Sequence, residues 1–230
     1  MDKTAFLERI VWLQQDYEPS PPVRRRLRDL ELIATVGPTA AGKSTLMRQS
    51  GLPYVMSDVT RSKRPGEFDG LTYNFRSDYK ELLKEVEAGE FVQFTIGQAG
   101  EFYGTKISSY PRSGLFTMSV LARLVSSFKN YGFKLVRPVF IVPPDYSEWI
   151  ERISEHHEIN LEPRFKEAIQ SLETALRDDG YLYVLNKNID DAVEQFLLVT
   201  SGTIDPDSQV HARQAAESLL SDLRRAWPTV

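Results

Sequence analysis

Apolar and polar positions along residues 31–200 follow two patterns, one with the period of a strand and one with the period of a helix. Short β-rich runs predict strands at Leu32–Val36, Pro53–Met56, Leu115–Met118, Pro138–Val142 and Leu182–Leu185. Helical spacing predicts helices at Ser44–Gln49, Val120–Phe128, Tyr146–Glu155, Phe165–Leu176 and Asp190–Val199. Strands that alternate with helices are typical of a parallel sheet covered by helices, so we predict an α/β fold.

The two ends of the chain show a helical pattern without strands. Residues 1–30 form a predicted N-terminal helical extension, in which a helix over 4–17 ends at the proline-rich segment Glu18–Pro22. Residues 201–230 form a predicted C-terminal helix after a linker at Gly202–Ser208. Its apolar stripe consists of Ala212, Ala215, Ala216, Leu219, Leu223 and Trp227. The simplest interpretation is core contact with the main domain or the N-terminal helix, and the alternatives are a homodimer seam or a partner site.

The composition limits the class of protein. The chain has 230 residues, of which 41% are hydrophobic, enough for one sizeable domain with appendages. A net charge of −4 does not favour a nucleic-acid partner. The absence of cysteine excludes disulfides and thiolate metal sites and fits a reducing compartment. Since no signal-peptide pattern or long apolar run is present, we expect a cytoplasmic protein without a membrane partner.

The segment between the first strand and the first helix of the α/β region carries the strongest chemical signal. It matches G-x-x-x-x-G-K-[ST], the phosphate-binding loop of P-loop NTPase-type proteins. Glycines let backbone N–H groups turn toward a β-phosphate, the lysine reaches the β- and γ-oxygens, and the serine can hold Mg²⁺. The predicted ATP-binding residues are Gly37, Pro38, Thr39, Ala40, Ala41, Gly42, Lys43, Ser44 and Thr45. Ser44 is the predicted metal ligand.

Helix–strand alternation is interrupted between residues 57 and 105, where charged residues, glycines and tyrosines are dense. Arg61, Arg64 and Tyr73 lie close together in sequence around two glycine turns, and Tyr103 and Thr105 follow. Guanidinium and phenol groups are suitable donors for a second phosphate. We interpret the segment as a ligand-recognition insert, although arginines in polar loops can also simply face water.

The order and spacing of these motifs resemble the guanylate kinase family over about residues 31–200. The motifs are G-P-T-A-A-G-K-S-T, S-x-x-T-R-x-x-R-x-G-E-x-x-G-x-x-Y-x-F, G-E-F, Y-G-T, I-V-P-P and V-L-N. The resemblance implies a core, an inserted monophosphate-binding lobe near 57–110 and a helical lid near 147–170. The activity that it implies is transfer of the ATP γ-phosphate to GMP or dGMP with Mg²⁺.

The resemblance also implies roles for individual residues. Ser57 and Thr105 match positions that contact the guanine base, and Glu67 matches one that orients the insert. The acceptor phosphate would be held by Arg61, Arg64, Tyr73 and Tyr103. The catalytic residues would be Lys43, Arg61, Arg152 and Arg164, of which Arg152 and Arg164 fit positions before and after the lid tip.

Three departures from the family pattern affect the expected chemistry. Gln93 follows the G-E-F motif where the family has a glutamate that reads guanine N1–H and N2–H, and an uncharged amide oxygen accepts only one of these hydrogens. Thr117 and Ser119 stand where the family carries two aspartates that help to organise Mg²⁺ and the base. The lid tip over 154–160 contains His156 and His157 instead of the expected arginine.

These departures leave three functions open. The first is a nucleoside monophosphate kinase with altered base choice, which the intact phosphate loop favours. The second is a weak or inactive nucleotide-binding module like those of scaffold proteins, which the missing aspartates and the missing lid arginine favour. The third is a kinase of a phosphorylated sugar on the same fold, which would not need a base-reading glutamate.

Overall fold

The structure is a computed structural model that describes residues 1–64, 66–97, 100–155 and 161–227. The chain forms two compact units. Unit 1 comprises Met1–Leu30, Val55–Gly114 and Asn130–Lys134. Unit 2 comprises Glu31–Tyr54, Leu115–Lys129 and Leu135–Val230. The N-terminal extension therefore shares a unit with the predicted acceptor lobe.

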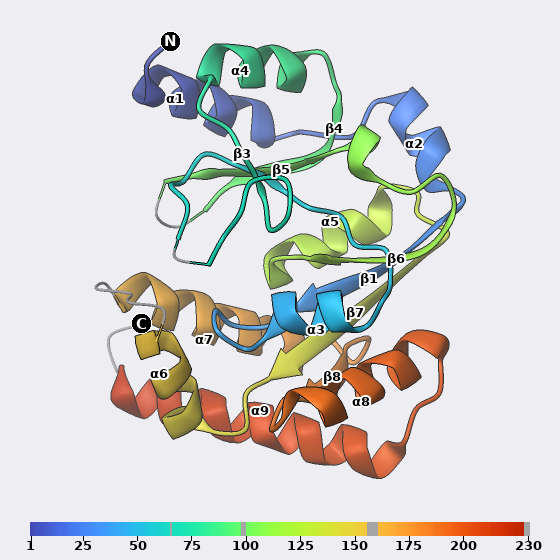
Figure 1. Cartoon of the computed structure of the whole chain (residues 1–230), viewed down its shortest axis with the longest axis vertical. Helices are drawn as coiled ribbons and strands as arrows, with labels where there is room; N and C mark the ends of the chain where they lie inside the picture. The colour runs from blue at the N-terminus through green and yellow to red at the C-terminus, as the bar shows by residue number, and fades with distance from the viewer. Residues whose placement is uncertain (65, 98–99, 156–160, 228–230) are drawn as a thin grey trace. The chain divides into compact units, whose positions relative to one another are not determined.

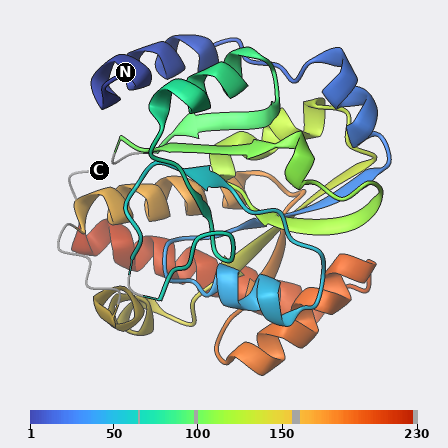
Figure 2. The ribbon, with the colours of Figure 1, turned by 45° about the horizontal axis from the view of Figure 1, so that its top comes forward.

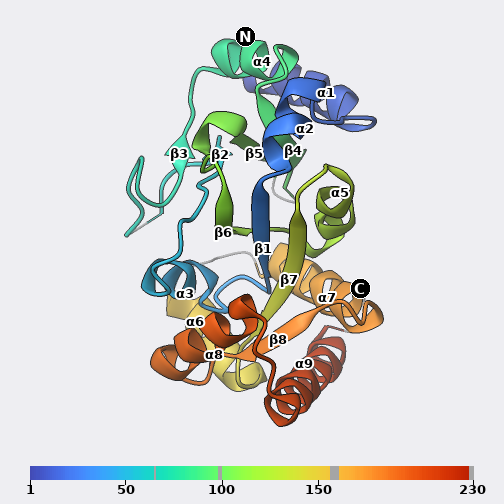
Figure 3. The same cartoon turned by 90° about the vertical axis from the view of Figure 1, so that its right-hand side faces the viewer.

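Unit 2 contains the predicted α/β sheet, and the predicted fold class is confirmed (Figure 3). The sheet has the order β6-β1-β7-β8, in which β1 pairs parallel with β7 and β7 pairs parallel with β8. Its strands are β1 (Leu30–Val36), β6 (Gly114–Ser119), β7 (Leu135–Val142) and β8 (Leu182–Leu185). The strands are almost continuously apolar, as expected where helices bury both faces of a parallel sheet.

The helices of unit 2 bury the sheet and connect its strands. They are α3 (Lys43–Gln49), α5 (Val125–Asn130), α6 (Tyr146–Glu155), α7 (Glu162–Arg177), α8 (Ile189–Ser201) and α9 (Pro206–Ala226), with a 3₁₀ turn η2 (Ala122–Leu124). Helix α3 packs against α8, and α7 runs beside α9 (Figure 1). Ile33, Leu46, Ile141, Val184 and Phe196 form part of one buried core cluster.

The C-terminal helix α9 makes core contact with unit 2, as the simplest interpretation of its apolar stripe expected. Leu219 and Leu223 are fully buried. The side-chain amide of Gln209 accepts from the backbone N–H of Tyr183 at 2.8 Å and donates to its carbonyl at 2.9 Å. Because these bonds resemble those of a neighbouring strand, α9 also covers the edge of β8.

Unit 1 contains a second sheet, with the order β3-β2-β5-β4. Its strands are β2 (Asp58–Val59), β3 (Asn74–Phe75), β4 (Phe91–Ile96) and β5 (Phe102–Lys106), followed by a 3₁₀ turn η1 (Ile107–Ser109). Its helices are α1 (Lys3–Gln14), α2 (Pro21–Leu27) and α4 (Tyr79–Glu87). Helices α1 and α4 cover one face of the sheet, where Phe6, Leu82 and Phe102 share a buried cluster (Figure 2).

Several predicted elements differ from those in the structure. The run Pro53–Met56 forms only an isolated bridge between Tyr54 and Thr117, and the pattern over 120–128 is split between η2 and α5. Helix α2 begins at Pro21, because proline is compatible with the first position of a helix. Helix α4 lies between residues 57 and 105, where the alternation of helices and strands was expected to be interrupted. Every helix within the described ranges is too short or too polar to cross a membrane.

Candidate active-site residues

The phosphate loop of unit 2 connects β1 to α3 and requires glycine at two positions. Gly37 has φ 143° and Gly42 has φ 90°, values that side chains rarely allow. A Cβ on Gly37 would lie 2.5 Å from the carbonyl oxygen of Ile141, and one on Gly42 would lie 2.2 Å from Nδ2 of Asn186. Backbone from β7 and a side chain that follows β8 thus approach the loop too closely for any larger residue.

Buried side chains fix the loop from outside. Asn186 donates from Nδ2 to the carbonyl of Ala41 at 2.8 Å, and Trp149 donates from its indole N–H to the carbonyl of Thr39 at 2.8 Å. Both side chains are almost completely buried. Ala40 has φ 62°, a left-handed conformation that is uncommon outside glycine and occurs at functional loops. The motif V-L-N contained Asn186, but the sequence gave no role to it or to Trp149.

Lys43 folds back over its own loop. Its ammonium group donates to the carbonyls of Gly37 at 2.6 Å and Pro38 at 2.7 Å. Burial lowers the pKa of Lys43, the charge of Glu167 opposes this shift, and the charge of Arg164 adds to it. Ser44, directly after Lys43, is exposed at the start of α3.

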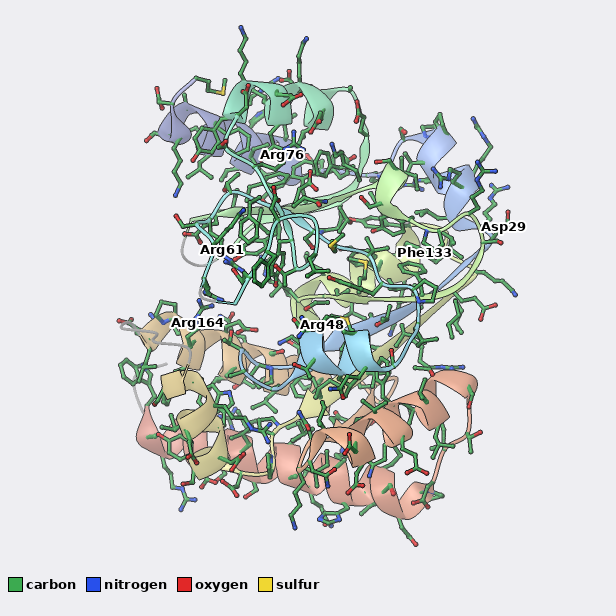
Figure 4. All side chains as sticks on the ribbon, viewed as in Figure 1. Asp29, Arg48, Arg61, Arg76, Phe133 and Arg164 are labelled. Atoms are coloured by element: carbon green, nitrogen blue, oxygen red, sulfur yellow. The ribbon has the colours of Figure 1, made fainter. Side chains whose placement is uncertain are left out.

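Helix α7 brings Arg164 and Glu167 into electrostatic interaction with Lys43. Figure 4 labels Arg164 at the N-terminal end of α7. Glu167 also accepts a hydrogen bond of 3.2 Å from the Thr39 hydroxyl. Sequence reasoning missed Glu167, because one carboxylate among several on a polar helix face carries no spacing signal.

Arg152 lies on α6, the first helix of the predicted lid. Its Nε bonds to Glu148 at 3.0 Å, and a terminal nitrogen donates to the carbonyl of Asn186 at 3.1 Å. Asn186 thereby links Arg152 to the phosphate loop. The lid-tip residues 156–160, including His156 and His157, lie outside the described residues.

The two hydroxyl residues in place of the family's aspartates have different environments. Thr117 is fully buried, lies 2.7 Å from the Thr35 hydroxyl and donates to the carbonyl of Ile33 at 3.1 Å. Ser119 is only half-buried at the end of β6. Over the ranges that the structure describes, no group of three or more His, Cys, Asp or Glu side chains could hold a metal ion.

Unit 1 carries a paired arginine in its polar loop. Arg61 forms two hydrogen bonds of 2.6 Å with Glu67 and stacks on the ring of Tyr73 at 4.8 Å. The side chain of Arg61 is 9% exposed. Burial alone would lower the pKa of Arg61, but the hydrogen bonds and charge of Glu67 raise it, so the guanidinium stays charged. The backbone N–H of Arg64 donates to the same Glu67 carboxylate at 2.9 Å, which ties the loop to this pair.

Tyr103 lies beside this arginine. Burial raises the pKa of Tyr103, and the positive charge of Arg61 opposes the shift. The phenol therefore remains protonated, and can donate a hydrogen bond, beside a permanent positive charge. Ser57, the other residue at the start of this region, is half-buried, and its carbonyl accepts from the N–H of Asn74 at 3.0 Å.

Gln93 and Thr105 lie opposite each other on antiparallel β4 and β5, and Tyr103 pairs with Thr95 two rungs away. Directly opposed residues share a face, so Gln93, Thr105 and Tyr103 lie on one polar face of the sheet. The Thr105 hydroxyl is 2.7 Å from that of Tyr110. Gln93 is 7% exposed, and its Oε1 is buried without a hydrogen-bond partner in the part of the chain that the structure describes.

The opposite face of the same sheet carries a charged network that sequence reasoning missed. Asp58, 1% exposed, accepts from Arg76 at 2.7 Å, and Glu85 on α4 pairs with Arg76 at 2.9 Å and with Lys106 at 2.8 Å. Arg61 and Arg76 lie on different sides of this sheet (Figure 4). The network links α4 to the strands, whereas Gln93 and Tyr103 lie on the other face of the sheet.

Comparison with known proteins identifies relatives of the whole α/β region and insert. The family model for guanylate kinase matches residues 30–199. The chain is 30% identical over 199 residues to a guanylate kinase of Synechococcus sp. (strain JA-3-3Ab), covering 80% of this chain and 86% of that protein. It is 30% identical over 183 residues to a guanylate kinase of Thermotoga maritima, covering 74% and 85%. Its fold is similar to the crystal structure of guanylate kinase from Anaplasma phagocytophilum, with a TM-score of 0.55 and 18% identity, covering 84% and 95%.

Proposed function

Because the chain belongs to the guanylate kinase family and is a nucleoside monophosphate kinase, we propose that it transfers the γ-phosphate of ATP to GMP or dGMP with Mg²⁺. The observation that carries this proposal is the polar face of the unit 1 sheet. There a charged arginine and Tyr103 lie on the same side as the unpaired carbonyl oxygen of Gln93. A monophosphate and a base edge are the two groups that such a face would bind.

In the donor half, the phosphate loop holds the β- and γ-phosphates of ATP through its backbone N–H groups. Lys43 exchanges the carbonyls of Gly37 and Pro38 for phosphate oxygens when ATP binds. The negative phosphates favour the charged ammonium and so offset the burial that lowers the pKa of Lys43. Arg152 and Arg164 add positive charge, which stabilises the equatorial oxygens of the transferred group.

The residues present fit a magnesium ion bound together with ATP. The exposed hydroxyl of Ser44 begins α3, and Ser119 is half-buried at the end of β6. Magnesium commonly keeps several waters and takes few protein ligands beside the phosphates of its nucleotide, so a carboxylate cluster is not required. Bound there, the ion would neutralise charge on the β- and γ-phosphates. Thr117 would act indirectly, since its hydroxyl is bonded inside the sheet.

In the acceptor half, Arg61, Arg64, Tyr73 and Tyr103 bind the monophosphate. The pairing with Glu67 keeps Arg61 charged and fixed, so little ordering is needed when the phosphate arrives. Ser57 contributes at the edge of this site, and Thr105 supports the base site from beside Gln93.

Gln93 determines which edge of the base is read. A carboxamide presents one acceptor next to one donor, and guanine presents the complementary pair at N1–H and O6. This contact satisfies the buried Oε1 of Gln93 and does not involve the 2-amino group. We therefore propose that the site selects 6-oxopurines, so that IMP, which shares N1–H and O6, competes with GMP better than AMP does.

A coupled assay with Mg-ATP tests the function directly. The acceptors are GMP, dGMP, IMP, AMP, dAMP, CMP, UMP and dTMP, and turnover is expected to be highest with GMP and dGMP. ATP binding without turnover on any acceptor would contradict the proposal and favour an inactive module. The proposed location is the cytoplasm, consistent with a chain without cysteine.

A further inference from the structure

The N-terminal helix lies outside the region that matches the guanylate kinase family, which begins at residue 30. Helix α1 nevertheless contributes to the core of the acceptor unit. Phe6 and Ile10 are fully buried in one cluster with Phe91 and Phe102 from the strands and Leu82 from α4. The extension is therefore part of the structure that supports the polar face of the sheet.

Two residues at and just after the C-terminal end of α1 bond to strand β4. The Tyr17 hydroxyl donates to the carbonyl of Phe91 at 2.5 Å, and Oε1 of Gln14 accepts from the N–H of Ile96 at 3.2 Å. Burial raises the pKa of Tyr17 to about 12, so the phenol remains a donor at neutral pH. Because β4 is the edge strand of its sheet, these bonds supply partners that a neighbouring strand would otherwise provide.

The bonded ends of β4 flank an irregularity that controls the direction of Gln93. Pairing with β5 passes from Phe91–Lys106 to Gln93–Thr105, so Val92 is an extra residue in a β-bulge. A bulge of this kind redirects the side chains that follow it. Tyr17 bonds to the first residue of the bulge, and its ring packs 4.4 Å from that of Phe94, directly after Gln93.

We propose that Gln14 and Tyr17 are positioning residues for the acceptor: they hold the bulged strand β4 at both ends so that the carboxamide of Gln93 faces the base. This role rests on the proposed function, in which Gln93 reads the base. It assigns a task in substrate selection to a segment that lies outside the family-matched region.

The variant Tyr17→Phe tests this role, because it removes the hydroxyl and keeps the ring against Phe94. We expect KM for GMP to rise about three- to tenfold, the size of one net hydrogen bond, and the preference for GMP over AMP to fall. KM for ATP and kcat should change less than twofold. Trp12→Ala is the matched control, since its 62% exposed side chain lies on the same extension, and it should leave every constant unchanged.

A double-mutant cycle separates positioning from general stabilisation. If Tyr17 acts through Gln93, Tyr17→Phe should cause no further loss of GMP preference in a Gln93→Ala background. Independent, additive losses would overturn the inference, as would a lowered melting temperature with unchanged KM for GMP. If the wild-type protein neither binds nor phosphorylates GMP, the proposed function is overturned as well. If the wild type phosphorylates GMP but the two variants show additive losses, or only a lowered melting temperature, this inference alone is overturned.

Discussion

The two carboxylate oxygens of Glu67 accept hydrogen bonds of 2.6 Å from the two terminal nitrogens of Arg61. Nε of Arg61 is buried and has no hydrogen-bond partner in the described ranges. The carboxylate thereby fixes the plane of the guanidinium and keeps it charged. A bound phosphate oxygen can satisfy Nε while the pair with Glu67 persists. Glu67 is thus expected to act on the acceptor through Arg61, in agreement with the orienting role that the family resemblance implied.

Glu67→Gln should weaken acceptor binding without affecting ATP. The amide keeps the shape of the side chain but removes one acceptor and the charge, so Arg61 loses hydrogen bonds worth about 1.5–3 kcal/mol. We expect KM for GMP to rise roughly ten- to hundredfold and KM for ATP to remain unchanged in steady-state kinetics. Glu90→Gln, an exposed change in the same unit, is the control. Equal effects on the two substrates would contradict the assignment of Glu67 to the acceptor.

The same pair predicts how stability depends on pH. Although burial alone would raise it, the pKa of Glu67 lies below its ordinary value of 4.5 because of the hydrogen bond and charge of Arg61. A lowered folded-state pKa contributes stability that is complete above pH 4.5 and is lost as the pH falls through that lower value. Thermal unfolding of the wild type should therefore become more acid-sensitive below pH 4.5 than that of Glu67→Gln. Parallel curves for the two proteins would show that the pair does not shift this pKa.

Lys43→Ala should abolish phosphoryl transfer and leave the fold intact. Lys43 contacts loop carbonyls and does not belong to the hydrophobic core, so its removal leaves no apolar cavity. We expect turnover below about one tenth of the wild-type value, a loss of more than about 1.4 kcal/mol, with an unchanged circular dichroism spectrum. The exposed change Lys80→Ala is the control. A variant with more turnover than this would show that the loop is not the donor site.

Arg61→Ala and Arg64→Ala should each raise KM for the acceptor and lower kcat. Both residues belong to the unit 1 loop, whereas the phosphate loop lies in unit 2, so ATP affinity should change little. Titration calorimetry with ATP on each variant checks this separation, with exposed Arg112→Ala as the control. Comparable damage to ATP affinity would contradict the placement of these arginines in the acceptor site.

Local sequence signals were sufficient for much of unit 2. Helix α6 and strand β8 begin and end at the predicted residues, because the apolar pattern of each segment is regular. Unit 1 was harder to predict: α4 is only nine residues long, and its three buried residues, Leu82, Leu83 and Val86, lie among charged residues in a segment that was interpreted as an irregular insert. Contacts such as Glu167 with Thr39 join residues 128 positions apart, and no local pattern encodes them.

The departure at Gln93 gives the most specific prediction. A carboxylate at this position would accept hydrogen bonds from both N1–H and N2–H of guanine. The carboxamide of Gln93 would instead accept from N1–H and donate to O6, without a contact to the 2-amino group. Gln93→Glu should therefore increase the kcat/KM ratio of GMP over IMP, and also that of GMP over AMP and CMP. One charge-assisted hydrogen bond corresponds to about 1–2 kcal/mol, or roughly five- to thirtyfold in each ratio.

The comparison of GMP with IMP makes this prediction more decisive than activity alone. The two nucleotides differ only in the 2-amino group, so any change in their ratio reports whether the side chain at position 93 reaches that group. Gln214→Glu introduces the same charge at an exposed position of α9 and should leave the ratios unchanged. A constant or lower GMP/IMP ratio in Gln93→Glu would mean that Gln93 does not contact the base. The buried Oε1 of Gln93 would then need a partner other than the acceptor nucleotide.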